Sequence, residues 1–193
     1  MMHCLEGVTL HERSGLTLHG PLHVGAGSVI QAAGGVSLGA GVVISFDCVL
    51  WSINHDYEGE RLPYGLARVR APVVIEDYVW LGRNVLVAPG SRIGEGAVVA
   101  MGSVVSGRVP PLAVIAGNPA RVVKYRSPWR YLALKRQGLS LWYQAEQCPA
   151  CHNPHFYLTE TRGESEWGRW WRWLPRRLRF RLQQCIIARL LSN

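Results

Sequence analysis

Apolar residues recur at every sixth position over a long central stretch of the chain. An α-helix repeats about every 3.6 residues and a strand about every two, so a sustained period of six fits neither element. The pattern instead indicates many short strands joined by regular corners. The recurring residues are Ile75, Leu81, Val87, Ile93, Val99 and Val105.

The positions around this ladder support the same interpretation. Small residues such as Gly82 and Gly94 directly follow ladder positions, which suits tight corners where a bulky Cβ would clash. The pattern is typical of a hexapeptide β-helix, in which three six-residue units form one turn of a triangular prism. Successive turns stack about 4.8 Å apart. Small or β-branched residues stand four places after ladder positions, namely Val79, Val85, Ser91, Ala97 and Ser103.

The same spacing extends toward the N-terminus. It holds for Val24, Ile30 and Val36, slips by two residues, and then resumes. We therefore predict an all-β fold, a parallel β-helix over residues 1–126. The residues that resume the spacing are Leu38, Ile44 and Leu50, and a looser version occurs at Leu10, Leu16 and Leu22.

A helical extension is predicted after the β-helix, over residues 127–193. Ser127 is a good N-cap and Pro128 suits the first helical position, so a helix should run to about Glu146. It would cap or flank the prism, because the strand edges at the end of a solenoid need a cover. The 193 residues can bury a substantial core, and 21 glycines agree with a fold that turns a corner every six residues.

The net charge of +8 comes from the tail of the chain. Residues 167–193 contain seven arginines and four tryptophans without one acidic residue, and the rest is close to neutral. This distribution argues against a nucleic-acid-binding protein. Such a tail either binds a membrane surface or packs back on the solenoid. Its arginines do not gather on one helical face, which favours packing on the solenoid.

The five cysteines form an odd and sparse set, which favours reduced thiols. With no secretory signal or membrane span, we expect a cytoplasmic protein, with the inner face of the membrane as the alternative for the tail. Cys148, Cys151 and His152 match a haem-attachment pattern, and Cys148, Cys151 and His155 could supply three zinc ligands. We favour a metal-free turn, because haem attachment requires export and structural zinc needs a fourth ligand.

The ladder is interrupted once, between Leu50 and Ile75. Residues 54–72 are too polar and irregular to continue the coil, and Pro72 marks the return to the next strand. Long excursions from rigid scaffolds often carry function. His55 stands at the mouth of this loop, which makes it the first candidate for catalysis.

Together, these motifs resemble the hexapeptide-repeat acyltransferases. The resemblance covers about residues 24–126 and rests on the ladder, the NHDY at the loop start and the segment VPPLAVIAGNPARVVKYR. The maltose, galactoside and polysaccharide O-acetyltransferases are the most similar members, with the chloramphenicol and streptogramin acetyltransferases further away. The resemblance implies a left-handed prism, a homotrimer, and acetyl-CoA in a groove between subunits.

The resemblance also gives His55 the role of general base. A sugar hydroxyl is a poor nucleophile at neutral pH, and an imidazole can take its proton as it attacks the thioester carbonyl. The resulting oxyanion needs a donor, either a backbone N–H or a side chain such as Asn54. Asp56, Tyr57 and Arg61 are loop candidates for contacts with the acceptor.

Further residues are candidates for the coenzyme and the acceptor. Trp80 has two possible roles. It flanks the acceptor or the pantetheine arm of the coenzyme, or it packs against a neighbouring subunit. The small corner residues Ala88, Ala100 and Gly102 would let the coenzyme approach, and Arg121 and Lys124 could meet its phosphates. Many relatives have T-K-D-V-P-P where this chain has S-G-R-V-P-P, so Arg108 would replace the usual lysine one position later.

Two other functions use the same prism. A γ-carbonic-anhydrase-type zinc enzyme needs three histidines from neighbouring coils and subunits, and His55 is the only histidine in the central coils. A non-catalytic scaffold would keep the prism without the chemistry, which the His55 and AGNPA motifs argue against. The sequence thus predicts an acetyl-CoA-dependent O-acetyltransferase acting on a sugar or polysaccharide precursor.

Overall fold

The computed structural model describes residues 7–139 of the chain. The chain divides after Ser127 into two compact units, Met1–Ser127 and Pro128–Asn193. The tail 167–193 and the cysteine-containing segment 148–155 lie outside the described residues.

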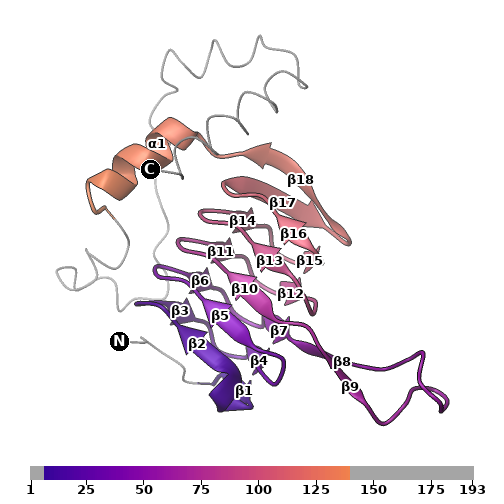
Figure 1. The fold of residues 1–193 in the computed structure, drawn as a ribbon. Helices are drawn as coiled ribbons and strands as arrows, with labels where there is room; N and C mark the ends of the chain where they lie inside the picture. Colours follow the sequence, from indigo (N-terminus) through magenta and orange to yellow (C-terminus); the bar gives the residue numbers. More distant parts are fainter. Residues whose placement is uncertain (1–6, 140–193) are drawn as a thin grey trace. The chain divides into compact units, whose positions relative to one another are not determined.

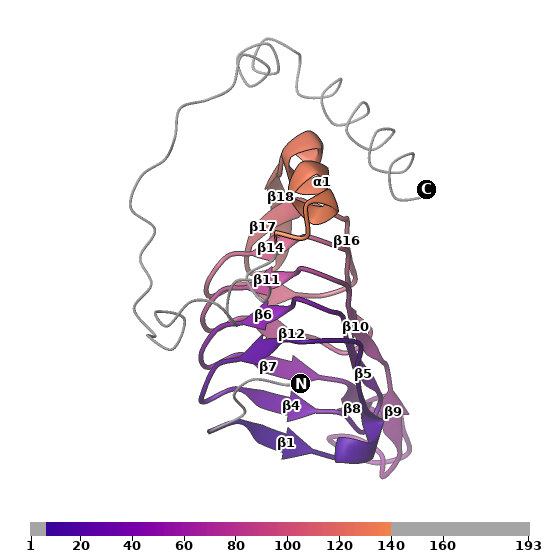
Figure 2. The same cartoon turned by 90° about the vertical axis from the view of Figure 1, so that its left-hand side faces the viewer.

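The first unit is a parallel β-helix with three sheets as its faces (Figures 1 and 2). The first face contains β1 (Thr9–His11), β4 (Val29–Gln31), β7 (Val49–Trp51), β12 (Leu86–Val87) and β15 (Val104–Val105). The second face contains β2 (Leu16–Leu18), β5 (Val36–Leu38), β10 (Val73–Ile75), β13 (Arg92–Ile93) and β16 (Arg108–Val109). The third face contains β3 (His23–Val24), β6 (Val43–Ile44), β11 (Trp80–Leu81), β14 (Val98–Val99), β17 (Ala113–Gly117) and β18 (Ala120–Tyr125). A short 3-10 turn, η1 (Arg13–Gly15), joins β1 to β2.

The predicted ladder forms the interior of the prism. On the third face Leu81 pairs with Ile44 on one side and Val99 on the other, and all three are fully buried. The intervening positions, including Ser91 and Ser103, are also fully buried. Most of the short strands of the central coils therefore direct one aliphatic side chain inward, and the predicted parallel β-helix is confirmed.

The slip of two residues lies at the corner between the first and second faces. In β5 both Val36 and Leu38 are buried, so this strand points two side chains inward. The paired residues Ile30 and Leu50 are 20 positions apart, whereas Val87 and Val105 are 18 apart. The early coils therefore carry two extra residues without losing the stacking of their faces.

The last strand of the prism is followed by an antiparallel partner that the six-residue period does not predict. β17 and β18 form a hairpin whose tip holds Asn118 and Pro119, so the AGNPA motif is a strand connection. β18 covers the outer edge of the third face. The edge is thus protected by the chain's own strand.

The second unit is described over residues 128–139 and contains α1 (Pro128–Arg136). The helix begins where the sequence predicts. It ends ten residues earlier than the predicted Glu146, because Gly138 has a φ of +65° and stops the helix in the left-handed conformation.

Candidate functional site

The excursion between β7 and β10 is a hairpin that leaves the corner between the first and second faces (Figure 1). Its stem is formed by β8 (Ile53–His55) and β9 (Arg68–Arg70), paired antiparallel. The predicted loop 54–72 is therefore a β-stem with a closed loop over residues 56–67. Pro72 directly precedes β10, as predicted for the return to the coil.

His55 ends the first strand of this stem and is exposed. Its backbone is held in the β8–β9 pairing opposite Arg68, and its imidazole stacks on the ring of Tyr64, with centroids 3.9 Å apart. Tyr64 was not a sequence candidate. No periodicity links residues nine positions apart within a closed loop, so only the folded loop reveals this contact.

Asp56 organises the loop from within. Its N–H donates to the carbonyl of Ala67 (3.2 Å), and its own carbonyl accepts from the N–H of Gly65 (2.7 Å). Its carboxylate accepts from the N–H of Glu58 (3.2 Å). These bonds give Asp56 a part in loop closure, in addition to the acceptor contact expected from the sequence.

The remaining loop candidates differ in where they lie. Successive residues of a strand point to opposite sides, so Asn54 does not share the side of the stem that carries His55. The Oδ1 of Asn54 accepts from the backbone N–H of His55 (2.9 Å). Tyr57 and Arg61 lie exposed in the loop.

Trp80 lies on the third face, which is opposite the corner that carries the hairpin. Its indole N–H donates to the hydroxyl of Ser45 (3.3 Å), and its side chain stays about half exposed. Within one chain, Trp80 and His55 therefore lie on different sides of the prism. Trp80 therefore does not lie beside the loop of its own chain.

The small corner residues predicted for the coenzyme are also distributed over two corners. Ala88 follows β12 at the corner that carries the hairpin, whereas Ala100 and Gly102 lie between β14 and β15. Their N–H groups already donate to carbonyls of neighbouring coils, those of Val105, Ile115 and Arg83 at 2.8–2.9 Å. These residues can offer a close approach to a ligand, but not an amide donor.

The cations predicted for the coenzyme lie near the last coil. Arg121 and Lys124 belong to β18, and Arg108 belongs to β16 on the second face. All three are exposed. The guanidinium of Arg121 donates to the carbonyl of Ala120 (3.0 Å).

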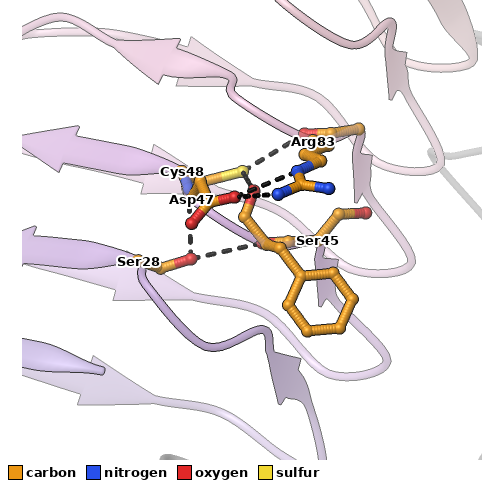
Figure 3. Close-up of polar contacts among 7 residues, drawn as sticks. Ser28, Ser45, Asp47, Cys48 and Arg83 are labelled. Carbon is orange, nitrogen blue, oxygen red and sulfur yellow. Dashed lines mark hydrogen bonds and ion pairs between the residues drawn. The ribbon is translucent and has the colours of Figure 1, made fainter. Parts of the chain in front are cut away.

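A polar network ties neighbouring coils together at the corner between the third and first faces (Figure 3). The guanidinium of Arg83 donates two hydrogen bonds to one carboxylate oxygen of Asp47, at 3.0 and 2.7 Å. The hydroxyl of Ser28 donates to the carbonyl of Ser45 (3.2 Å) and accepts from the N–H of Cys48 (3.2 Å).

Cys48 in this network is a free, fully buried thiol. Its Sγ donates to the carbonyl of Gly82 (3.2 Å), and burial raises the pKa of the thiol. A thiol that is buried and protonated is a poor nucleophile. Cys48 therefore serves the fold.

Within residues 7–139, no three His, Cys, Asp or Glu side chains are placed to hold a metal ion together. Cys148, Cys151, His152 and His155 lie outside this part of the chain.

Comparison with known sequences identifies the repeat. Residues 72–107 match the family described as bacterial transferase hexapeptide (six repeats). Over 57 residues the chain is 49% identical to a 2,3,4,5-tetrahydropyridine-2,6-dicarboxylate N-acetyltransferase of Staphylococcus aureus. The matched segment makes up 30% of this chain and 24% of that protein. The chain thus spans about a quarter of the length of this curated relative.

Comparison with solved structures gives the same fold. A hexapeptide-repeat-containing acetyltransferase of Vibrio cholerae superposes with a TM-score of 0.53 at 28% identity, covering 61% of this chain and 66% of that one. A structure of this acetyltransferase complexed with acetyl coenzyme A superposes with a TM-score of 0.51 at 26% identity. The superposition covers 63% of this chain and 72% of that one. A galactoside acetyltransferase in complex with coenzyme A shares the fold, with a TM-score of 0.59 at 22% identity and coverage of 82% and 67%.

Proposed function

Because this chain belongs to the hexapeptide-repeat superfamily with its left-handed β-helix, we propose that it transfers an acetyl group from acetyl-CoA to a hydroxyl of a sugar or surface-polysaccharide precursor. The observation that carries the proposal is the exposed His55 at the base of the hairpin extruded from the β-helix. The Vibrio cholerae acetyltransferase with bound acetyl coenzyme A supports the choice of donor.

In the proposed reaction, His55 is the general base. Its exposed imidazole takes the proton of the acceptor hydroxyl while the oxygen attacks the thioester carbonyl. The new C–O bond forms, the C–S bond breaks, and the proton passes from the imidazolium to the leaving thiolate of coenzyme A. Tyr64 covers one face of the ring, so the acceptor approaches the ring edge, where the nitrogens lie.

The distribution of the candidate residues favours a site completed by a second copy. Trp80, Ala100 and Gly102 cannot surround the same ligand as His55 within one chain. We propose a homotrimer, in which these residues of one copy face the hairpin of another, with Ala88 beside it. Arg108, Arg121 and Lys124 would then meet the phosphates of the coenzyme.

Two faces of the prism are suited to such an assembly. Beyond Thr9 and His23 of the first coil, one outward side chain of each strand up to β15 and β17 adds to an apolar column on these faces, whereas the outward column of the second face is largely polar. Apolar surface of this kind commonly marks an interface between copies. The column of the first face is Val29, Val49, Leu86 and Val104; that of the third is Val43, Trp80, Val98 and Val114; that of the second is Thr17, Ser37, Val74, Arg92 and Arg108.

An acceptor screen tests the proposed activity. Sugars and polysaccharide fragments are incubated with acetyl-CoA, and released coenzyme A is measured by chromatography, because the chain's own five cysteines would react with a thiol reagent. His55→Gln should lower turnover by roughly 10²- to 10⁴-fold while acetyl-CoA still binds. Near-normal turnover of this variant would remove His55 as the base, and absence of any turnover with acetyl-CoA would favour a non-catalytic scaffold.

An amine acceptor is the second candidate, favoured by the 49% identity to an N-acetyltransferase. The same base chemistry serves an amine as well as a hydroxyl. Amino sugars and amino acids are therefore included in the screen. A product that survives mild alkali is an amide, whereas an ester is hydrolysed.

We also propose that residues 167–193 touch an anionic membrane surface, on the basis of their seven arginines and four tryptophans. Within residues 7–139, no helix is long and apolar enough to cross a membrane. Deletion of residues 167–193 should abolish co-sedimentation with anionic vesicles in low salt while a soluble acceptor is still acetylated. Equal sedimentation of both proteins would contradict the proposal.

A further inference from the structure

Two arginines of β9 share the side of the hairpin stem that carries His55. Arg68 is the direct cross-strand partner of His55, and Arg70 is the partner of Ile53. Directly opposed residues point to the same side of an antiparallel pair, with Cβ atoms about 5 Å apart, and residues two apart in a strand also share a side. The guanidinium of Arg68 is therefore within reach of whatever the imidazole contacts.

Neither arginine is engaged by the protein itself. In the described part of the chain, Arg83 is paired with Asp47 at 2.7 Å and Arg92 with Glu76 at 2.6 Å. Arg68 and Arg70 are exposed and make no ion pair or side-chain hydrogen bond within residues 7–139.

The acidic residues of the nearby loop do not pair with these arginines. The carboxylate of Asp56 accepts from the backbone of Glu58, and neither Glu58 nor Glu60 reaches the two guanidinium groups. Two like charges therefore stand on one side of a short stem without a compensating carboxylate. Such a pair is suited to an external anion, which a guanidinium can bind with two parallel hydrogen bonds.

We propose that Arg68 and Arg70 bind a carboxylate or phosphate of the acceptor, so that the acceptor is an anionic saccharide and Arg68 determines this specificity. This inference rests on the proposed acetyl transfer. Arg68 contacts the anion, and the anion in turn orients the acceptor hydroxyl toward His55.

The phosphates of coenzyme A are the other anions that the two arginines could bind. In acetyl-CoA the long pantetheine arm separates the phosphates from the thioester that must reach His55. A cation directly opposite His55 therefore lies near the thioester and the acceptor. We therefore assign the anion bound by the two arginines to the acceptor.

Matched acceptor pairs test the proposal in the full-length protein. Glucuronic acid is compared with glucose, and galacturonic acid with galactose, using wild type, Arg68→Gln, Arg68→Lys and Arg70→Gln. Arg13→Gln, at an exposed arginine of η1, is the control. We expect wild type to favour the carboxylated sugar, and Arg68→Gln to lower its kcat/KM by about 10- to 100-fold. The kcat/KM for the neutral sugar and the KM for acetyl-CoA should stay within about twofold of wild type, with Arg68→Lys intermediate.

Three results would overturn the proposal. The first is an equal loss with charged and neutral acceptors, and the second is a raised KM for acetyl-CoA without a change in acceptor preference. The third is a change in oligomeric state in Arg68→Gln, which would assign the arginines to contacts between copies. If no acceptor is acetylated, the proposed function fails, and calorimetric binding of the sugar pairs to wild type and Arg68→Gln still decides whether the arginines select anions.

Discussion

The ring of Tyr64 lies against the imidazole of His55, with centroids 3.9 Å apart and planes inclined by 23°. Tyr64 belongs to the loop and His55 to the end of β8, so the loop folds back on its own stem. This contact covers one face of the imidazole and limits its rotation. The position of the candidate base therefore depends on the loop being closed.

Removal of this contact should lower turnover without removing the base. Tyr64→Ala should reduce kcat by about 2- to 10-fold, in line with the free energy of an aromatic pair, while Tyr64→Phe keeps the stack and the rate. Initial rates at saturating acetyl-CoA measure kcat, and the KM for acetyl-CoA should not change. An equal loss in both variants would mean that the phenol hydroxyl, and not the stack, supports His55.

The sequence predicts the prism well because its signal is local and repeated. One buried aliphatic residue every six positions determines the strands, and Ile75, Leu81 and Val87 all lie in the core as expected. The β17–β18 hairpin has no such signal. β17 still pairs in parallel with β14, but β18 turns back and pairs antiparallel with β17, outside the repeat.

The candidate site was predictable only in part, for a similar physical reason. His55 could be identified because it stands where the ladder stops. Tyr64 and Arg68 could not, because the stacking contact and the cross-strand register arise only when the loop closes. Asn54 was grouped with His55 by sequence proximity, yet strand alternation separates their sides.

Replacement of a corner glycine tests the close stacking of the coils. A Cβ on Gly82 would lie 2.7 Å from the backbone nitrogen of Met101, which cannot move without its coil. Gly82→Ala should lower the free energy of unfolding by about 1–3 kcal/mol, as overpacking does. Denaturant titration measures this change.

Gly102→Ala is the comparison for this experiment. A Cβ there meets no atom within 4 Å, but the residue has a φ of +69°. The expected cost is backbone strain alone, about 1–2 kcal/mol. Wild-type stability of Gly82→Ala would show that the coils can separate at this corner.

His23 should make the fold less stable in mild acid. Burial lowers the pKa of His23 from its ordinary value of 6.5, since the charged imidazole is poorly solvated in β3. As pH falls below about 6.5, the unfolded chain takes up a proton that the folded chain does not, so the free energy of unfolding decreases. The decrease levels off once pH is below the folded-state pKa.

Denaturant midpoints between pH 7.5 and 5 measure this effect. His23→Gln should show a shallower decrease with acid than wild type, because its side chain does not titrate. His11→Gln, at an exposed histidine of β1, is the matched control and should follow wild type. The same slope in all three proteins would remove His23 as the cause.

The apolar column on the first face should hold the assembly together. Leu86 lies in the middle of this column, between Val49 and Val104, with 44% of its surface exposed in the single chain. Light scattering at micromolar concentration should give a trimer for wild type and smaller species for Leu86→Glu, because a carboxylate there would be buried unpaired between copies. Thr17→Glu places the same charge on the polar second face and should leave the trimer intact.

Leu86→Glu should also lose acetyl-CoA binding if a second copy completes the site. A monomeric wild type would contradict both the assembly and the shared site, whereas a trimer unaffected by Leu86→Glu would assign the contact to the third face.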